Sequence, residues 1–297
     1  MATRAFAPAK VNLALHLVGL RADGYHLLDS LVVFADTGDW LTATPSDTLS
    51  LRVTGPRAAG VPTDDNNLVL KAAQRLRTLR QVTSGAAIHL EKHLPHGGGI
   101  GGGSSDAAAT LRLLARLWNV APLTGAEALP LGADIPVCLA APAPTRMQGI
   151  GETLTPVPPL PDGWLVLVNP GIHVATAAVF REHDRLFGTS PTGTFAPWTP
   201  AQDFASWLTA QQNALTPTVC HDAFAPVIPT ILHRLRTQTG CLAAGMSGSG
   251  STCWAWFAHQ PDAQSAAASF ADHPAWWAVP ARILRPQDPL FQITNPT

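Results

Sequence analysis

The chain has 297 residues, of which 46% are hydrophobic and 13% charged, and its formal net charge is −1. This length leaves room for one large domain or two modest ones around a substantial apolar core. The near-neutral charge argues against nucleic acid or a membrane surface as the main partner. The four cysteines lack metal-ligand or CxxC spacing, which indicates buried thiols in a reducing compartment. We therefore expect a cytoplasmic protein without a targeting segment, present as a monomer or weak homodimer.

Alternating and apolar runs predict strands in the first third of the chain, at residues 6–18, 27–35, 40–44, 49–53 and 86–91. We expect a turn at residues 21–24 and a loop at residues 55–66. Apolar residues recur at helical spacing over residues 68–81, which predicts an amphipathic helix.

A proline-rich segment at residues 149–161 is the expected boundary between two lobes, residues 1–156 and 157–297. Before it, the sequence predicts a helix at residues 107–118 and a helix start within residues 131–138. Beyond it we expect, in chain order, a strand at 164–168, a helix at 175–186, a loop at 189–200, helices at 201–210 and 224–239, strands at 241–245 and 252–258, a helix at 262–270 and a strand at 281–284. Strands and helices do not alternate regularly, so the pattern favours an α+β fold with two lobes.

Residues 97–103 contain six glycines interrupted only by Ile100, and Ser104 and Ser105 follow directly. Glycine lets the backbone bend sharply, so its N–H groups can converge on an anion, and the next helix points its positive end at the same place. With two serine hydroxyls and Asp106 as a helix cap, the pattern predicts a triphosphate cradle. A flexible linker is the alternative, but a predicted strand and helix flank the run. The run also lacks the P-loop lysine and the early βαβ unit of a dinucleotide-binding turn.

Lys10 and Asn12 lie two residues apart in the first predicted strand, so their side chains face the same side. A lysine there can pair with an acid or a phosphate, and an amide can orient a hydroxyl. A solvated strand face is the structural alternative. Asp134 is the sole acid in the apolar segment at residues 131–136, which makes it either a helix cap or a functional acid.

Tyr25, the only tyrosine in the chain, stands beside His26. An aromatic face can stack on a nucleobase and a histidine can hydrogen-bond the base's edge, whereas a core aromatic residue is the alternative. Residues 245–252, GMSGSGST, form a second loop of small residues that enters a predicted strand. This loop is either part of a ligand site or a tight turn.

Together these segments resemble the GHMP kinase superfamily. Its three motifs occur here in order, as PAKVNL, PHGGGIGGGSS and GMSGSGS. Within the superfamily, the segments RADGYH, DNNLVLKAA and LGADIPVCL are similar to the kinases that act on 4-diphosphocytidyl-2-C-methyl-D-erythritol, and the similarity spans residues 6–257. The resemblance implies a two-lobed GHMP kinase fold with its active site in the cleft between the lobes. The N-terminal lobe, residues 1–156, would bind ATP, and residues 157–297 would form the C-terminal kinase lobe.

The resemblance also implies a reaction, the ATP-dependent phosphorylation of the 2-hydroxyl of 4-diphosphocytidyl-2-C-methyl-D-erythritol. The products would be the 2-phosphate and ADP, in the non-mevalonate pathway of isoprenoid precursor biosynthesis. The partner would thus be a small molecule that carries a cytidine diphosphate. We expect Mg²⁺ with ATP, although the sequence offers no dedicated acidic cage for a metal.

Residue roles follow from the same resemblance. Asp134 would accept or orient the proton of the attacking hydroxyl, and Lys10 would hold Asp134 ionised and offset charge on the phosphoryl group. Tyr25 and Phe180 would sandwich the cytosine, whose edge His26 would hydrogen-bond, and Asn12 and Thr176 would contact the substrate. ATP would contact Asn67, Lys92, Pro95, His96, Gly97, Gly98, Gly99, Ile100, Gly101, Gly102, Gly103, Ser104 and Ser105.

The sequence departs from the family's pattern at three places. The segment at residues 119–130 is short, Arg181 stands where a lysine is common, and His96 stands where an apolar residue is common. Two other functions stay open, another small-molecule GHMP kinase of the homoserine or mevalonate type and a catalytically silent nucleotide-binding protein. A base-stacking site at Tyr25 would argue against the first, and the presence of Lys10 with Asp134 argues against the second.

Overall fold

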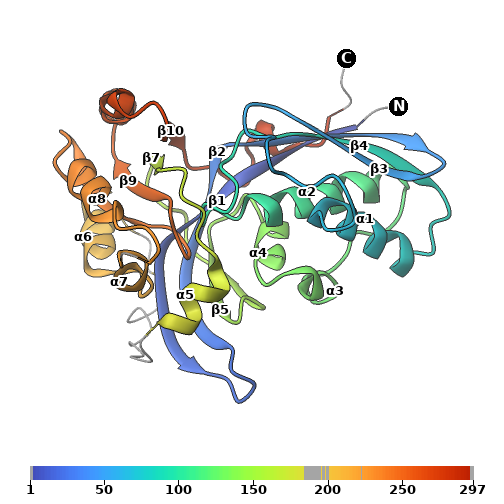
Figure 1. Ribbon diagram of the computed structural model, residues 1–297, viewed down its shortest axis with the longest axis horizontal. Coiled ribbons are helices and arrows are strands. Elements are labelled where there is room, and N and C mark those ends of the chain that lie inside the picture. The colour runs from blue at the N-terminus through green and yellow to red at the C-terminus, as the bar shows by residue number, and fades with distance from the viewer. Residues whose placement is uncertain (1–2, 184–194, 196–197, 199–200, 222, 295–297) are drawn as a thin grey trace.

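The computed structural model describes residues 3–183, 195, 198, 201–221 and 223–294, and its strands form two sheets (Figure 1). The first sheet contains β1 (Thr3–Leu20), β2 (His26–Ser46), β3 (Leu49–Thr54), β4 (Gly85–Glu91), β5 (Thr145–Gly149) and β6 (Thr153–Pro156). The second contains β7 (Trp164–Asn169), β8 (Cys241–Met246), β9 (Cys253–Phe257) and β10 (Trp277–Arg282). The predicted α+β class is confirmed.

Helices flank both sheets. The first lobe carries α1 (Leu68–Leu79), α2 (Gly102–Leu117), α3 (Gly125–Ala128) and α4 (Ile135–Leu139), which lie on one side of the first sheet (Figure 1). The second lobe carries α5 (Thr176–Glu182), α6 (Ala201–Ala210), α7 (Thr216–Val219), α8 (Ile228–Arg236) and α9 (Gln260–Ala268), and short 3-10 turns lie at Leu129–Leu131, Ser269–Asp272 and Pro289–Phe291. Within the described residues, no helix combines the length and apolar character needed to cross a bilayer.

The centre of the first sheet is a long antiparallel hairpin of β1 and β2. One edge of β2 pairs with β1, and its other edge pairs with β4 near one end and with β5 near the other. The sequence predicted two strands where β2 is one. Pro8 pairs with Gly38 and Ala9 pairs with Ala35, so the two intervening residues of β2 form a bulge rather than the end of a strand.

The second sheet is antiparallel throughout, in the order β10-β7-β9-β8, and its central strands β7 and β9 are buried on both faces. On β7, Val166 and Val168 face the core under α8 and α9, whereas Leu165 and Leu167 face the long hairpin. Side chains alternate between the faces of a strand, so a strand buried on both sides reads as a continuous apolar run. This explains why the sequence predicted β7 and β9 well.

The β1–β2 hairpin belongs to both lobes. Phe6 packs in the core of the first lobe, Val11 in the cluster between the lobes, and Leu15 and Leu17 in the core of the second lobe. The division predicted between residues 156 and 157 therefore stays a prediction. It splits the chain into two segments, whereas β1 of the first segment contributes to the cores of both lobes.

Other differences from the predicted elements have local causes. The strand β6 and the helix α7 were not predicted, because both are four residues long and contain proline. The last strand was predicted at residues 281–284, but β10 begins at Trp277. Most of the predicted loop at residues 189–200 lies outside the described residues, as does the end of the helix predicted at 175–186.

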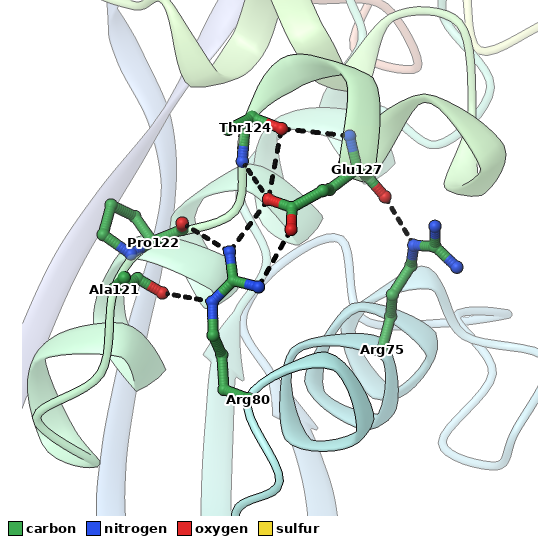
Figure 2. Close-up of polar contacts among 6 residues, drawn as sticks. All are labelled: Arg75, Arg80, Ala121, Pro122, Thr124 and Glu127. Carbon is green, nitrogen blue, oxygen red and sulfur yellow. Dashed lines mark hydrogen bonds and ion pairs between the residues drawn. The ribbon is translucent and has the colours of Figure 1, made fainter.

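A polar network connects α1 to α3 and sets the path of the short segment before Asp134 (Figure 2). Thr124 caps α3 in a capping box with Glu127. The Arg80 guanidinium, just after α1, donates to both carboxylate oxygens of Glu127 at 2.9 and 2.8 Å and to the backbone carbonyl oxygens of Ala121 and Pro122. The segment at residues 119–130 is thereby held against α1 despite its shortness.

Candidate active site

The glycine run forms a tight loop that leads into α2. Gly97, Gly99 and Gly101 have φ values of 65°, 73° and 62°, in the left-handed region that favours glycine. A Cβ on Gly99 would lie 2.6 Å from the carbonyl oxygen of Gly250, so the loop needs glycine for close approach as well. The helix begins at Gly102, five residues before the predicted start. The predicted cap role of Asp106 is therefore wrong, because this residue lies inside the helix.

The second small-residue loop holds the glycine loop in place. The Ser247 hydroxyl donates to the carbonyl oxygen of Gly99 at 2.9 Å. The Thr252 backbone N–H and hydroxyl donate to the carbonyl oxygen of Gly98 at 3.0 and 2.5 Å. Since these residues connect β8 to β9, the two lobes meet at the glycine loop.

Lys10 and Asp134 form an ion pair beside this loop. The Lys10 Nζ donates to Asp134 Oδ2 at 2.9 Å. The Lys10 side chain is 4% exposed, whereas that of Asp134 is 36% exposed. Asp134 takes the N-cap position of α4 without a side-chain capping bond, and the Lys10 backbone N–H donates to the Ile100 carbonyl oxygen at 3.0 Å. A carboxylate open to a ligand is thus fixed next to the anion loop.

Asn12 lies two residues after Lys10 on β1, and it is buried. Its Nδ2 donates to the Ser30 hydroxyl at 2.7 Å, and Ser30 donates to the carbonyl oxygen of Ala14. Among the described residues, Asn12 Oδ1 has no hydrogen-bond partner. A buried amide oxygen without a partner is costly, and Asn12 lines the cavity, so its side chain is a candidate ligand contact.

Aromatic side chains line another part of the same cavity. The His26 and Phe180 rings lie 5.2 Å apart between centroids, and the His26 and His183 rings lie 6.3 Å apart. Tyr25 is 58% exposed on the turn between β1 and β2, with the Arg21 guanidinium 5.3 Å from its ring centroid. The Thr176 hydroxyl is hydrogen-bonded to the Ser249 hydroxyl at 2.7 Å.

These parts surround one cavity of about 990 Å³ whose walls come from both lobes. This confirms the expected position of the site in the cleft between them. The predicted site residues on its wall are Lys10, Asn12, Tyr25, His26, His96, Gly97, Gly98, Gly99, Gly101, Gly102, Gly103, Ser104, Asp134, Thr176 and Phe180. A basic residue, an exposed carboxylate, a phosphate-type loop and aromatic rings therefore share one space.

Comparison with known proteins is consistent with this geometry. The family model for the GHMP kinases N terminal domain matches residues 67–142, and the GHMP kinases C terminal model matches residues 200–275. A 4-diphosphocytidyl-2-C-methyl-D-erythritol kinase from Cereibacter sphaeroides is 50% identical over 284 residues, which cover 95% of this chain and 99% of the relative. A kinase of the same name from Paramagnetospirillum magneticum is 51% identical over 282 residues, which cover 94% of this chain and 97% of the relative. The chain belongs to the 4-diphosphocytidyl-2-C-methyl-D-erythritol kinase family.

Solved structures agree with this family assignment. A crystal structure of 4-(cytidine 5'-diphospho)-2C-methyl-D-erythritol kinase matches with a TM-score of 0.76 at 31% identity, over 94% of this chain and 98% of that one. A homoserine kinase from Cytophaga hutchinsonii matches with a TM-score of 0.67 at 17% identity, over 95% of each chain. The second match shows a shared fold alone.

Five predicted nucleotide contacts of this kinase do not lie on the cavity wall. Asn67 is the N-cap of α1, where its side chain accepts from the Val69 backbone N–H. Lys92 is buried in ion pairs with Asp39 and Asp106. The three others are buried around the loop: Pro95, Ile100 and Ser105.

Two histidines on the cavity wall were not predicted, His173 and His183. His173 stacks on His96 with ring centroids 5.8 Å apart and planes 10° apart, and a Cβ on Gly97 would overlap the His173 ring. Burial, then His173 and Lys92, lower the pKa of His96. A single histidine in a loop carries no periodic signal in the sequence. Only the structure therefore reveals that His173 stacks on His96.

Proposed function

We propose that this kinase transfers the terminal phosphoryl group of ATP to the 2-hydroxyl of 4-diphosphocytidyl-2-C-methyl-D-erythritol. The products are the 2-phosphate and ADP, in the methylerythritol phosphate pathway of isoprenoid precursor biosynthesis. The observation that carries the proposal is the Lys10–Asp134 ion pair on the wall of a cavity shared by a glycine loop and an aromatic cluster. Family membership at 50% identity over 95% of the chain supports the same reaction.

The glycine loop is the proposed site of the triphosphate. Its backbone N–H groups and the N-terminal end of α2 present positive partial charge, which suits an anion. The proposed contacts are the wall residues His96, Gly97, Gly98, Gly99, Gly101, Gly102, Gly103 and Ser104. The other predicted contacts lie off the wall, and their proposed part is to support the loop: Asn67, Lys92, Pro95, Ile100 and Ser105.

Lys10 and Asp134 have different roles in the proposed transfer. Asp134 Oδ1 or Oδ2 accepts the hydroxyl proton, or its hydrogen bond, as the substrate oxygen bonds to the γ-phosphorus and the bond from that phosphorus to ADP breaks. Lys10 lies between this carboxylate and the loop, so its ammonium offsets charge that develops on the phosphoryl oxygens. Asn12 Oδ1 accepts from a hydroxyl of the substrate and so fixes its orientation.

Mg²⁺ fits this site only when it is bound together with the triphosphate. Among the described residues, no group of three or more histidine, cysteine, aspartate or glutamate side chains could hold a metal ion. Asp134 and the Ser104 hydroxyl are two of the oxygen donors on the cavity wall, and Mg²⁺ in kinase sites is held mainly by phosphate oxygens and water. When bound, the ion would neutralise phosphate charge.

The aromatic cluster is the proposed cytosine site. Tyr25 and Phe180 supply ring faces, His26 supplies a hydrogen-bonding edge, and Thr176 lies on the same wall. Substrates such as homoserine and mevalonate have no base to stack, so these aromatic residues favour the cytidylyl compound over the alternative GHMP kinase functions.

The test is ADP release by the purified protein with ATP and Mg²⁺. The candidate alcohols are 4-diphosphocytidyl-2-C-methyl-D-erythritol, methylerythritol phosphate, homoserine and mevalonate. We expect turnover with the cytidylyl compound alone. Turnover with homoserine or mevalonate instead would overturn the substrate assignment, and ATP binding without any turnover would favour the silent nucleotide-binding protein.

The compartment and assembly belong to this proposal as well. All four cysteines are free thiols, and burial raises the pKa of Cys138 to about 12 and that of Cys253 further, so these thiols resist oxidation. Unreactive thiols and an ATP-dependent reaction suit the cytoplasm. A monomer or weak homodimer is the proposed state, and light scattering over a concentration series would measure it.

A further inference from the structure

Directly beneath the glycine loop lies a buried triad of charged side chains. The Lys92 Nζ contacts Asp39 Oδ2 at 2.5 Å and Asp106 Oδ2 at 2.7 Å. The three side chains are 3%, 0% and 4% exposed, in the order Lys92, Asp39 and Asp106. None of them lies on the cavity wall. The triad therefore cannot touch a ligand in the cavity without a change in the loop.

The triad is connected to both ends of the glycine loop. At the entrance, Asp39 Oδ1 accepts from the backbone N–H groups of His93 at 2.6 Å and Leu94 at 2.8 Å. At the exit, Asp106 lies in the second turn of α2, and the Lys92 Nζ lies 3.2 Å from the place where a Cβ on Gly102 would stand. One lysine thus ties the strand end before the loop to the helix that follows it.

Burying this triad in the protein core carries a large desolvation cost. Three buried charges must be desolvated, and apolar side chains of similar volume often stabilise a fold at least as well. Among the described residues, Asp106 Oδ1 has no hydrogen-bond partner. Burial raises the pKa of Asp106 well above its ordinary value, against the opposing effect of Lys92. Stability alone therefore gives little reason for this arrangement, whereas buried ion pairs can impose one geometry on the backbone.

We propose that Lys92, Asp39 and Asp106 are positioning residues that hold the two ends of the glycine loop in the conformation that binds the nucleotide's phosphates. They act through backbone atoms at residues 93–94 and through α2. The loop itself has left-handed glycines at three positions, so it has little conformational preference of its own and depends on anchors at its ends. This inference rests on the proposed role of the loop in binding ATP.

The experiment compares ADP affinity, measured by calorimetry, among matched variants of the full chain. Asp106→Asn keeps an oxygen acceptor for the Lys92 ammonium, so we expect its Kd for ADP within about three-fold of wild type. Asp106→Ala removes the acceptor, and we expect ADP binding to weaken by about ten-fold or more, because small displacements of binding groups are costly. Rescue by the asparagine distinguishes positioning from general loss of stability.

Glu127→Gln is the control, because it breaks the side-chain ion pair with Arg80 in the same lobe (Figure 2), and neither residue lies on the cavity wall. We expect this variant to be less stable but to bind ADP as wild type does. If Asp106→Ala also lowers stability without changing the Kd for ADP, the triad is purely structural and the proposal is overturned.

Asp39→Asn provides a second arm if Asp106→Ala fails to fold. One amide oxygen cannot accept both from the backbone N–H groups of residues 93–94 and from Lys92, so about a ten-fold loss of ADP affinity is expected again. Wild-type affinity in this folded variant would also overturn the proposal. ADP binding does not involve the alcohol, so this test stays valid even if the alcohol substrate is assigned wrongly. A wild-type protein that binds no ADP would contradict the proposed function itself.

Discussion

Asp134 is the residue on which the proposed chemistry depends most directly. We expect Asp134→Asn to lower kcat by about 10²–10⁴-fold, because the amide cannot accept a proton. The Kd for ADP should stay close to the wild-type value, since the glycine loop is intact. Single-turnover phosphoryl transfer and ADP calorimetry measure the two quantities. Wild-type turnover by this variant would remove Asp134 from the mechanism.

Tyr25 tests the cytosine site, because its ring is exposed and free of core packing. We expect Tyr25→Ala to raise the KM for the cytidylyl substrate roughly ten-fold, the size of one base-stacking contact, with kcat little changed. Tyr25→Phe keeps the ring and serves as the control, with a KM near wild type. An unchanged KM in the alanine variant would contradict stacking by Tyr25.

Local patterns predicted many of the residues on the cavity wall, because these residues fall into groups that each lie within a few positions of sequence. The glycine run, Lys10 with Asn12, and Tyr25 with His26 are of this kind. His173 and the Asp39–Lys92 contact could not be predicted in the same way. Their partners lie more than fifty residues away along the chain, and only the packing of the lobes brings them together.

At the scale of elements, the Arg80–Glu127 network predicts a pH-dependent contribution to stability. The hydrogen bonds from Arg80, then those from Thr124, lower the pKa of Glu127 to about 2. Because the folded pKa lies below the unfolded value, the stabilisation is present above pH 4.5 and is lost as the pH falls toward 2. We therefore expect the urea midpoint of Glu127→Gln to lie below that of wild type at pH 7 and to converge with it near pH 2. Equal midpoints at pH 7 would contradict this.

Element types followed from periodicity, whereas element ends depended on geometry that a pattern does not encode. The apolar spacing of α1 predicted its helix nearly to the residue. The start of α2 was predicted late, because glycine disfavours helices and yet Gly102 and Gly103 form the first positions of this helix. The bulge in β2 likewise looked like the end of a strand.

At the scale of the whole molecule, the shared β1–β2 hairpin predicts that both lobes unfold together. Leu17 is fully buried in the core of the second lobe although it lies near the start of the chain. We expect Leu17→Ala to lower the free energy of unfolding by about 2–5 kcal/mol. The transition should stay single by both far-UV circular dichroism and tryptophan fluorescence. Two separate transitions would show that the lobes are independent units.

The same hairpin determines when the protein can finish folding during its synthesis. Leu15 and Leu17 leave the ribosome well before the residues of α8 and β9 that share their core, such as Ile228 and Phe257. Many multidomain chains complete an N-terminal domain while the remainder is still being made. Here the end of β1 stays without these core partners until α8 and β9 have been made. Apolar surface that stays exposed in this way during synthesis is prone to aggregation until its partners are translated.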